Sequence, residues 1–69
     1  MITAGIDVGS ISTKAAIVKD HVVLATKVIQ TGYNAQNAGR KVFDEIQAET
    51  GISSSQIQAV VATGYGRKI

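Results

Sequence analysis

The 69-residue chain contains no cysteine, no proline and no tryptophan. Without cysteine, these residues cannot form disulfide bonds, thiolate nucleophiles, or metal and iron–sulfur sites held by thiolates. Aromatic residues are scarce, at two tyrosines and one phenylalanine, and the seven basic residues are scattered along the chain. With few stacking platforms and no basic stripe, the sequence argues against nucleic-acid binding despite its net charge of +2.

Long apolar runs are also missing. No segment approaches the roughly 20 apolar residues that a membrane-spanning helix needs, and the start of the chain lacks a basic segment followed by an apolar signal core. We therefore expect no membrane insertion and a cytoplasmic location. The 45% of apolar residues suit one small globular unit, but a core of this size supplies only about 3 to 5 kcal/mol of stability.

The first half of the chain has the patterns of three β-strands. From Ile2 to Val8, apolar residues alternate with small or polar ones, at the period of a pleated strand. A nearly continuous apolar run within Thr13 to Lys19 favours a second strand in the middle of a sheet, covered on both faces. Asp20 and His21 form a solvated polar turn, and Val22 to Gln30 predicts a third strand that completes an antiparallel meander.

A helix and a further strand follow. Asn34 is the expected N-cap of a helix from about Ala35 to Thr50, and Gly51 ends it. The helix would turn an apolar face that includes Val42 and Ile46 towards the sheet, with Glu45 largely outward. Ser53 and Gln56 have the spacing of a capping box, which would open a single helical turn. A fourth strand is predicted from Ile57 to Thr63. Because a long helix precedes it, we expect it to lie parallel to the first strand, in the sheet order 3-2-1-4.

The segment from Gly5 to Lys14 carries the residue types that bind the phosphates of a nucleotide and their metal ion. Asp7 falls at the end of the first predicted strand, facing away from its apolar residues. Gly9 can take backbone angles closed to other residues and lets an oxyanion approach the main chain. A lone carboxylate would repel a triphosphate, so Asp7 favours a divalent cation between them, Mg²⁺ that keeps several waters.

Hydroxyl groups and one ammonium group follow Gly9 in a short bend. The bend offers hydroxyl and backbone N–H donors, and Lys14 supplies a compact positive charge. The spacing differs from those of the P-loop and of dinucleotide-binding loops. The alternative is an ordinary turn, in which Asp7 caps a bend and Gly9 opens a hairpin. The hydroxyls and the lysine together favour phosphate binding, and the candidate residues are Gly9, Ser10, Ile11, Ser12, Thr13 and Lys14.

Two segments of the chain resemble known ATPases. Residues Gly5 to Ser10, with Ser12 to Lys14, resemble the first phosphate motif of the actin, sugar-kinase and Hsp70 superfamily. Residues Val60 to Arg67, which read Val-Val-Ala-Thr-Gly-Tyr-Gly-Arg, resemble the signature shared by 2-hydroxyacyl-CoA dehydratase activators and benzoyl-CoA reductase ATPase subunits. These proteins form the BadF/BadG/BcrA/BcrD-type family. The resemblance covers the whole chain, which corresponds to the first quarter or so of a family member.

The resemblance implies an α/β fold, namely a ribonuclease H-like half-domain. It would be a mixed sheet of order 3-2-1-4, an antiparallel meander plus one parallel strand, with one main covering helix. Residues 1–69 would form a single partial domain, the N-terminal subdomain of an actin-like ATPase fold. Within it, Asp7 would act as the catalytic residue that orients the water shell of Mg²⁺. Gly64 would leave room for the nucleotide at the end of the last strand, and the partner of Arg67 stays open.

The implied function is that of an ATPase which couples ATP hydrolysis to low-potential electron transfer. Family members bind ATP or ADP with Mg²⁺, form homodimers and dock on a CoA-ester dehydratase or reductase. They hold an iron–sulfur cluster through cysteines beyond residue 69. One alternative is a sugar or carboxylate kinase of the same superfamily. Another is a non-catalytic interaction module, in which Gly5 to Lys14 is only a hairpin and exposed strand edges promote self-association.

Overall fold

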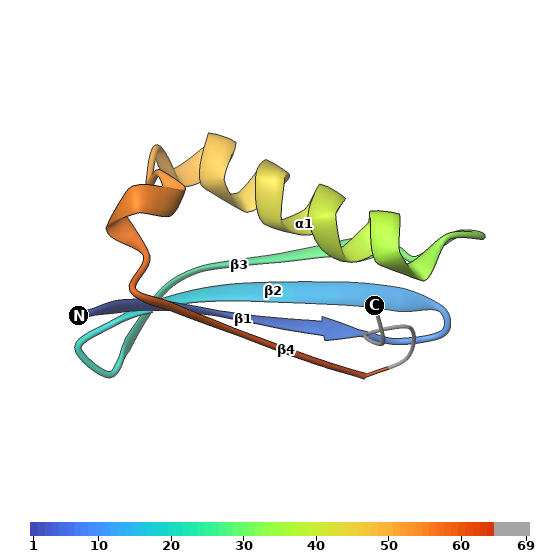
Figure 1. Cartoon of the computed structure of the whole chain (residues 1–69), viewed down its shortest axis with the longest axis horizontal. Coiled ribbons are helices and arrows are strands. Elements are labelled where there is room, and N and C mark those ends of the chain that lie inside the picture. Colours follow the sequence, from blue (N-terminus) through green and yellow to red (C-terminus); the bar gives the residue numbers. More distant parts are fainter. Residues whose placement is uncertain (65–69) are drawn as a thin grey trace.

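The computed structural model describes residues 1–64 and consists of a four-stranded sheet with one long helix on one face (Figure 1). The sheet order is β3-β2-β1-β4, with β1 antiparallel to β2 and parallel to β4. This order confirms the predicted 3-2-1-4 arrangement. In chain order the elements are β1 (Ile2–Val8), β2 (Ser12–Lys19), β3 (Val22–Gln30), α1 (Ala35–Thr50), the 3-10 turn η1 (Ser54–Gln56) and β4 (Ala59–Gly64).

The turn between β2 and β3 is the short polar turn expected from the sequence. Asp20 and His21 both have positive φ angles, 50° and 71°, as in the two-residue turns whose twist matches that of a hairpin. Both residues are exposed. The N-terminal ammonium group donates a hydrogen bond to Asp20 Oδ1 at 2.7 Å, and this bond lowers the pKa of the Asp20 carboxyl group. The turn is therefore tied to the start of β1.

Alternation along the strands decides which side chains enter the core. In β2, Thr13, Ala15 and Ile17 are buried, whereas Lys14 between them is exposed. The expectation that this strand would be covered on both faces is wrong for the described residues. In that part of the chain α1 is the one long helix, and it covers one face. The buried core cluster comprises Ala4, Ala15, Ile17, Val42 and Ile46.

Local capping fixes both ends of α1 where the sequence predicts them. The Asn34 side chain accepts a hydrogen bond from the Asn37 N–H at 3.0 Å, which satisfies one of the unpaired donors of the first turn. Gly51 adopts the left-handed conformation, with φ 75°. Ser53 donates its N–H to Gln56 Oε1 at 2.9 Å, and the capping box opens one 3-10 turn.

The fourth strand begins later than predicted. It starts at Ala59 rather than at Ile57, and it runs one residue further, to Gly64. The Ile57 N–H closes the preceding turn on the Ser54 carbonyl at 3.2 Å, and Gln58 is the first residue whose N–H reaches β1, on the Ile2 carbonyl at 2.8 Å. The 3-10 turn that follows the capping box thus uses the Ile57 N–H, which would otherwise have extended the strand.

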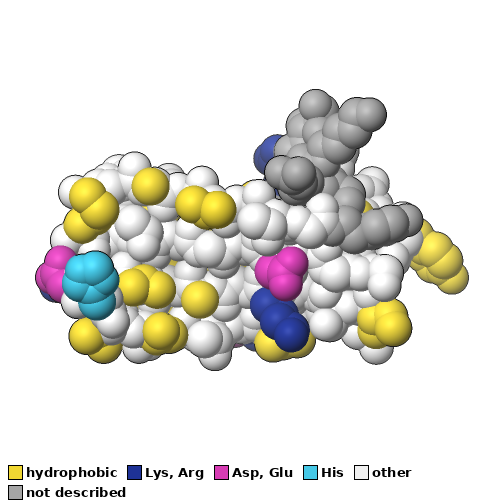
Figure 2. All heavy atoms as spheres, turned by 90° about the horizontal axis from the view of Figure 1, so that it is seen from below, with side chains coloured by type: hydrophobic (Ala, Val, Ile, Leu, Met, Phe, Trp, Pro, Cys, Tyr) yellow, Lys and Arg dark blue, Asp and Glu magenta, His cyan; other side chains and the backbone are white. Residues whose placement is uncertain are grey.

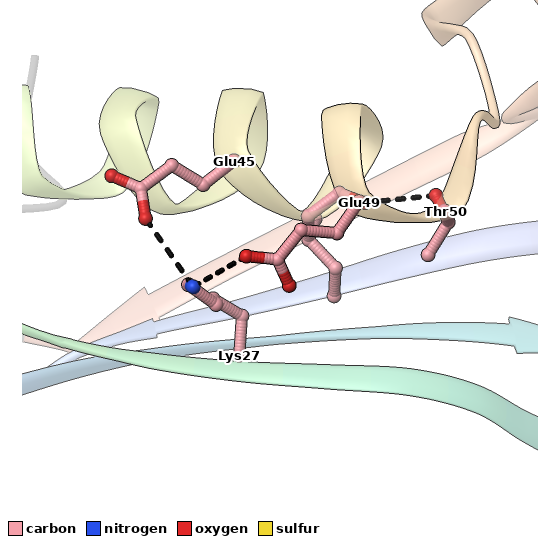
Figure 3. A network of polar contacts seen from close by, with 5 residues as sticks. Lys27, Glu45, Glu49 and Thr50 are labelled. Atoms are coloured by element: carbon pink, nitrogen blue, oxygen red, sulfur yellow. Dashed lines mark hydrogen bonds and ion pairs between the residues drawn. The ribbon is translucent and has the colours of Figure 1, made fainter.

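One ion-pair cluster joins the sheet to the helix (Figure 3). Lys27 in β3 lies 2.5 Å from Glu49 Oε2 and 3.5 Å from Glu45 Oε1. The prediction that Glu45 faces largely outward is wrong, since its side chain turns back to Lys27. The hydrogen bond to Glu49, together with the charges of both carboxylates, raises the pKa of Lys27. These ion pairs hold the last turns of α1 against β3.

Replacing Lys27 by methionine is expected to lower the melting temperature of the chain slightly at neutral pH. Because folding raises the pKa of Lys27, its contribution is fully present below the unfolded value of about 10.4 and is lost as the pH rises through the folded value. Thermal melts from about pH 8 upward would measure this. Lys41→Met, on an exposed part of α1, is the control. Equal effects of the two variants at neutral pH would contradict the prediction.

Candidate functional site

Asp7 lies at the end of β1, on the face of the sheet opposite α1. It is exposed, and the strand register places it between Lys14 of β2 and Thr63 of β4. Directly paired residues share a face of the sheet, so these three side chains gather on the open face. Thr63 Oγ1 lies 3.5 Å from Asp7 Oδ1, longer than a typical hydrogen bond between oxygens. Figure 2 views this face and shows an acidic and a basic side chain side by side.

Gly64 brings the end of β4 against the end of β1. Its φ angle is 98°, a conformation that side chains other than glycine rarely adopt. A Cβ atom at this position would lie 2.5 Å from the Val8 carbonyl oxygen and 2.7 Å from Asp7 Oδ1. Only glycine therefore fits here, and the structure places this predicted site residue directly beside Asp7.

Gly9 is required for a different reason from the one predicted. The sequence suggests that it adopts unusual backbone angles, but it is not among the residues with positive φ. Instead, its N–H donates to the Ser12 carbonyl at 2.9 Å, and a Cβ atom would lie 2.7 Å from that same oxygen. Close approach of two backbone segments in the tight turn, rather than a left-handed conformation, excludes a side chain.

In the loop between β1 and β2, most carbonyl oxygens are hydrogen-bonded within the protein, whereas two N–H groups have no acceptor among the described residues. The carbonyl oxygens of Gly9, Ile11 and Ser12 each accept a hydrogen bond from within the protein. No described residue accepts a hydrogen bond from the N–H of Ser10 or of Ile11. Ser10 is exposed and Ile11 is 82% exposed. Successive N–H groups in a turn are the kind of donors that anion sites use.

Thr13 lies on the other face of the sheet from Asp7 and Lys14, and the prediction that its hydroxyl binds phosphate is wrong. Its side chain is 0% exposed, and its Oγ1 lies 2.7 Å from Thr31 Oγ1. Because side chains alternate along a strand, Thr13 points to the helix side, whereas Ser12 and Lys14 fall on the open side. Of the predicted residues, Asp7, Gly9, Ser10, Ile11, Ser12, Lys14 and Gly64 lie together around the ends of β1 and β4 and the start of β2.

Thr31 is the residue near this site that the sequence does not single out. It follows β3 directly and is 6% exposed. Its hydroxyl donates to the Gly9 carbonyl at 2.6 Å, and its N–H donates to the Ile11 carbonyl at 2.9 Å. No spacing in the sequence signals these contacts, because they depend on β3 lying beside β2. Arg67, whose partner the sequence leaves open, lies outside the described residues.

The open face has a hollow with room beside the charged residues. Its volume is about 430 Å³, and its lining includes Gly5, Asp7, Lys14, Ala16, Val61 and Thr63. Residues 1–64 hold no cluster of three or more His, Cys, Asp or Glu side chains suited to a metal ion. A magnesium ion at Asp7 would therefore not be held by a cluster of side chains from these residues, and Mg²⁺ usually keeps several waters beside one or two carboxylates. Within the same residues, no helix has the length and apolarity to cross a membrane.

Comparison with known proteins gives consistent matches over nearly the whole chain. The model of the BadF/BadG/BcrA/BcrD ATPase family matches residues 4–69. The activator of lactoyl-CoA dehydratase from Anaerotignum propionicum is 41% identical over 68 residues, 97% of this chain and 26% of that protein. The 2-hydroxyisocaproyl-CoA dehydratase activator from Clostridioides difficile is 35% identical over 68 residues, 97% of this chain and 25% of that protein.

Solved structures agree with the sequence matches. The activator of the 2-hydroxyisocaproyl-CoA dehydratase from Clostridium difficile, with bound ADPNP, superposes with a TM-score of 0.82 at 34% identity, over 97% of this chain and 25% of that one. Component A of the (R)-2-hydroxyglutaryl-CoA dehydratase of Acidaminococcus fermentans gives a TM-score of 0.86 at 29% identity, over 97% and 26%. The chain therefore spans about a quarter of the length of these relatives.

Proposed function

The chain belongs to the BadF/BadG/BcrA/BcrD ATPase family, and we propose that it forms the first phosphate-binding segment of an ATPase that activates a CoA-ester dehydratase. Two relatives at 41% and 35% identity are activators of such dehydratases, and a similar structure was solved with bound ADPNP. Family membership favours this proposal over the kinase alternative. Residues 1–69 would be one part of an actin-like ATPase domain, and the remaining walls of the nucleotide cleft would come from other residues.

The observation that carries the proposal is the arrangement at the loop between β1 and β2. The N–H groups of Ser10 and Ile11, from which no described residue accepts a hydrogen bond, lie in the loop between the strands that carry exposed Asp7 and exposed Lys14. The N–H groups and the Ser10 and Ser12 hydroxyls would hold phosphate oxygens, and Lys14 would balance their charge. Asp7 would hold the water shell of Mg²⁺, whose charge lowers the cost of bringing a triphosphate to a carboxylate. Gly9 and Gly64 would keep the space open.

The electron-transfer part of the function depends on residues that this chain does not contain. We propose that the intact protein is a cytoplasmic homodimer that passes an electron at low potential to a CoA-ester dehydratase or reductase. With no cysteine among the 69 residues, the chain supplies no thiolate ligand, so an iron–sulfur cluster would be held elsewhere in the intact protein. The direct test is an assay of that protein for ATP hydrolysis and for activation of a purified 2-hydroxyacyl-CoA dehydratase. No ATP hydrolysis would overturn the proposal.

The 69-residue chain alone is expected to bind ATP weakly at best. It would supply one wall of the cleft, and water in the open half would screen the charges that hold the phosphates. Isothermal titration calorimetry with ATP and Mg²⁺ would measure the affinity, with Asp7→Asn titrated alongside to identify binding at this site. Tight binding that requires Mg²⁺ would contradict the prediction and the partial-domain proposal on which it rests.

A further inference from the structure

Thr31 reaches the phosphate-binding loop with both its backbone and its side chain. Its hydroxyl donates to the Gly9 carbonyl at 2.6 Å, and its N–H donates to the Ile11 carbonyl at 2.9 Å. The side-chain contact joins the residue after β3 to a loop residue 22 positions earlier in the chain. A single residue therefore holds two of the carbonyls in the loop where the sequence places the phosphate contacts.

Thr13 completes a directed chain of hydrogen bonds. A hydroxyl has one hydrogen to donate, and Thr31 gives its hydrogen to the Gly9 carbonyl, which can only accept. In the contact of 2.7 Å between the two hydroxyls, Thr13 must therefore be the donor. The chain runs from Thr13 through Thr31 to Gly9. Both side chains are nearly or fully buried, at 0% and 6% exposed, and hydrogen bonds in series strengthen one another in such surroundings.

The planar trans peptide converts this inward hydrogen bond into an outward donor. The carbonyl of Gly9 and the N–H of Ser10 belong to the same peptide unit and point in opposite directions. When Thr31 holds the carbonyl inward, the Ser10 N–H is turned towards solvent, where no described residue accepts from it. The hydrogen bond also keeps a carbonyl oxygen, whose partial negative charge would repel phosphate, directed away from the site. The Ile11 carbonyl is removed from the site in the same way.

We propose that Thr31 is a positioning residue of the nucleotide site, which acts through the Gly9 and Ile11 carbonyls without touching the nucleotide. This inference rests on the proposed function, because it assigns the outward N–H groups to ATP phosphates. Electrostatic stabilisation depends on donors that are already oriented before the ligand arrives. The hydroxyl of Thr31 is the group that orients the Ser10 peptide.

The test uses the intact protein and compares Thr31→Val, which keeps the side-chain shape, with Thr31→Ser, which keeps the hydroxyl. In Thr31→Val we expect the KM for ATP to rise about tenfold, the loss typical of one hydrogen bond. Since N–H groups bind phosphate both before and during its transfer, the change falls mainly on KM with little change in kcat. Thr31→Ser is expected to retain a KM within about twofold of wild type.

Thr50→Val is the matched control. Thr50 also uses its hydroxyl in a partly buried hydrogen bond, to the Ile46 carbonyl at 2.8 Å, but it lies at the far end of α1 (Figure 3). A purely structural loss would reduce the amount of active protein, and so lower apparent kcat at constant KM in both valine variants. A folded Thr31→Val protein with wild-type KM, or an equal rise of KM in Thr50→Val, would overturn the inference.

The experiment also covers a Thr31→Val variant that fails to fold, and it separates failure of this inference from failure of the proposed function. If Thr31→Val does not fold, Thr31→Ser still decides, because a folded serine variant with a KM about tenfold higher would show that the hydroxyl does not set the affinity. A wild-type intact protein that turns over no ATP would overturn the proposed function, and the inference with it. If the wild-type protein hydrolyses ATP and folded Thr31→Val has the same KM for ATP, the inference is overturned but the proposed function is not.

Discussion

Replacing Asp7 by asparagine in the intact protein is expected to lower kcat for ATP hydrolysis by about 10² to 10³, the loss typical of removing one preorganised electrostatic contact. The substitution keeps the shape of the side chain but removes the charge that would hold the Mg²⁺ water shell. Asp7 is exposed, and within residues 1–64 its carboxylate makes one long contact, with Thr63. The fold should therefore tolerate the change. Steady-state ATPase assays, with circular dichroism to verify folding, would measure the effect.

Asp44→Asn is the matched control for this experiment. Asp44 is also an exposed carboxylate, but it lies on α1, on the other side of the sheet from Asp7. We expect its ATPase activity to equal that of wild type. If Asp7→Asn retained full activity while folded, the carboxylate would have no part in the reaction, and the hairpin interpretation of the Gly5 to Lys14 segment would be favoured.

Replacing Gly64 by alanine is expected to damage both the stability of the chain and the site. A left-handed or similarly strained conformation costs a side chain about 1 to 3 kcal/mol, and here a Cβ atom would also lie within 2.5 to 3.0 Å of Val8 and Asp7 atoms. The end of β4 must then move away from β1. Against a core that supplies about 3 to 5 kcal/mol, this loss is large. Urea unfolding of the 69-residue chain would measure it.

Gly5→Ala separates this effect from the general cost of replacing a glycine in the sheet. A Cβ atom at Gly5 would meet nothing within 4 Å, and alanine is favoured over glycine in a strand by about 0.5 to 1 kcal/mol. We expect Gly5→Ala to be neutral or slightly stabilising in the 69-residue chain. Equal unfolding midpoints for the two variants would show that the contact between β4 and Asp7 does not constrain the fold.

Local sequence patterns predicted the elements of this chain well. The bounds of β1, β3 and α1 agree with the predictions, because alternation, a polar two-residue turn and side-chain caps act between residues that are close in sequence. The prediction failed at the start of β4, where two local signals compete. The capping box opens a 3-10 turn, and this turn uses the Ile57 N–H that the apolar pattern assigned to the strand.

The residue types of the site could be recognised from the sequence, but which of them face the ligand and which are buried could not. A carboxylate, a turn glycine and hydroxyls before a lysine indicated phosphate chemistry, and the exposure of Asp7, Ser10 and Ile11 agrees with that hypothesis. Hydroxyl-bearing neighbours look alike in a sequence. Strand alternation sends Thr13 into the core and leaves Ser12 on the open side, so only one of the two can face a ligand.

The sequence by itself determined the strands, the helix and the candidate loop, since each depends on interactions between near neighbours. Tertiary structure alone decided three contacts between distant residues: Thr31 on the Gly9 carbonyl, Thr13 on Thr31, and Gly64 against Asp7. Each arises because β3 and β4 flank β2 and β1 in the sheet. Hydrogen-bond partners and steric limits at the strand ends are set by that side-by-side packing, which no spacing along the chain specifies.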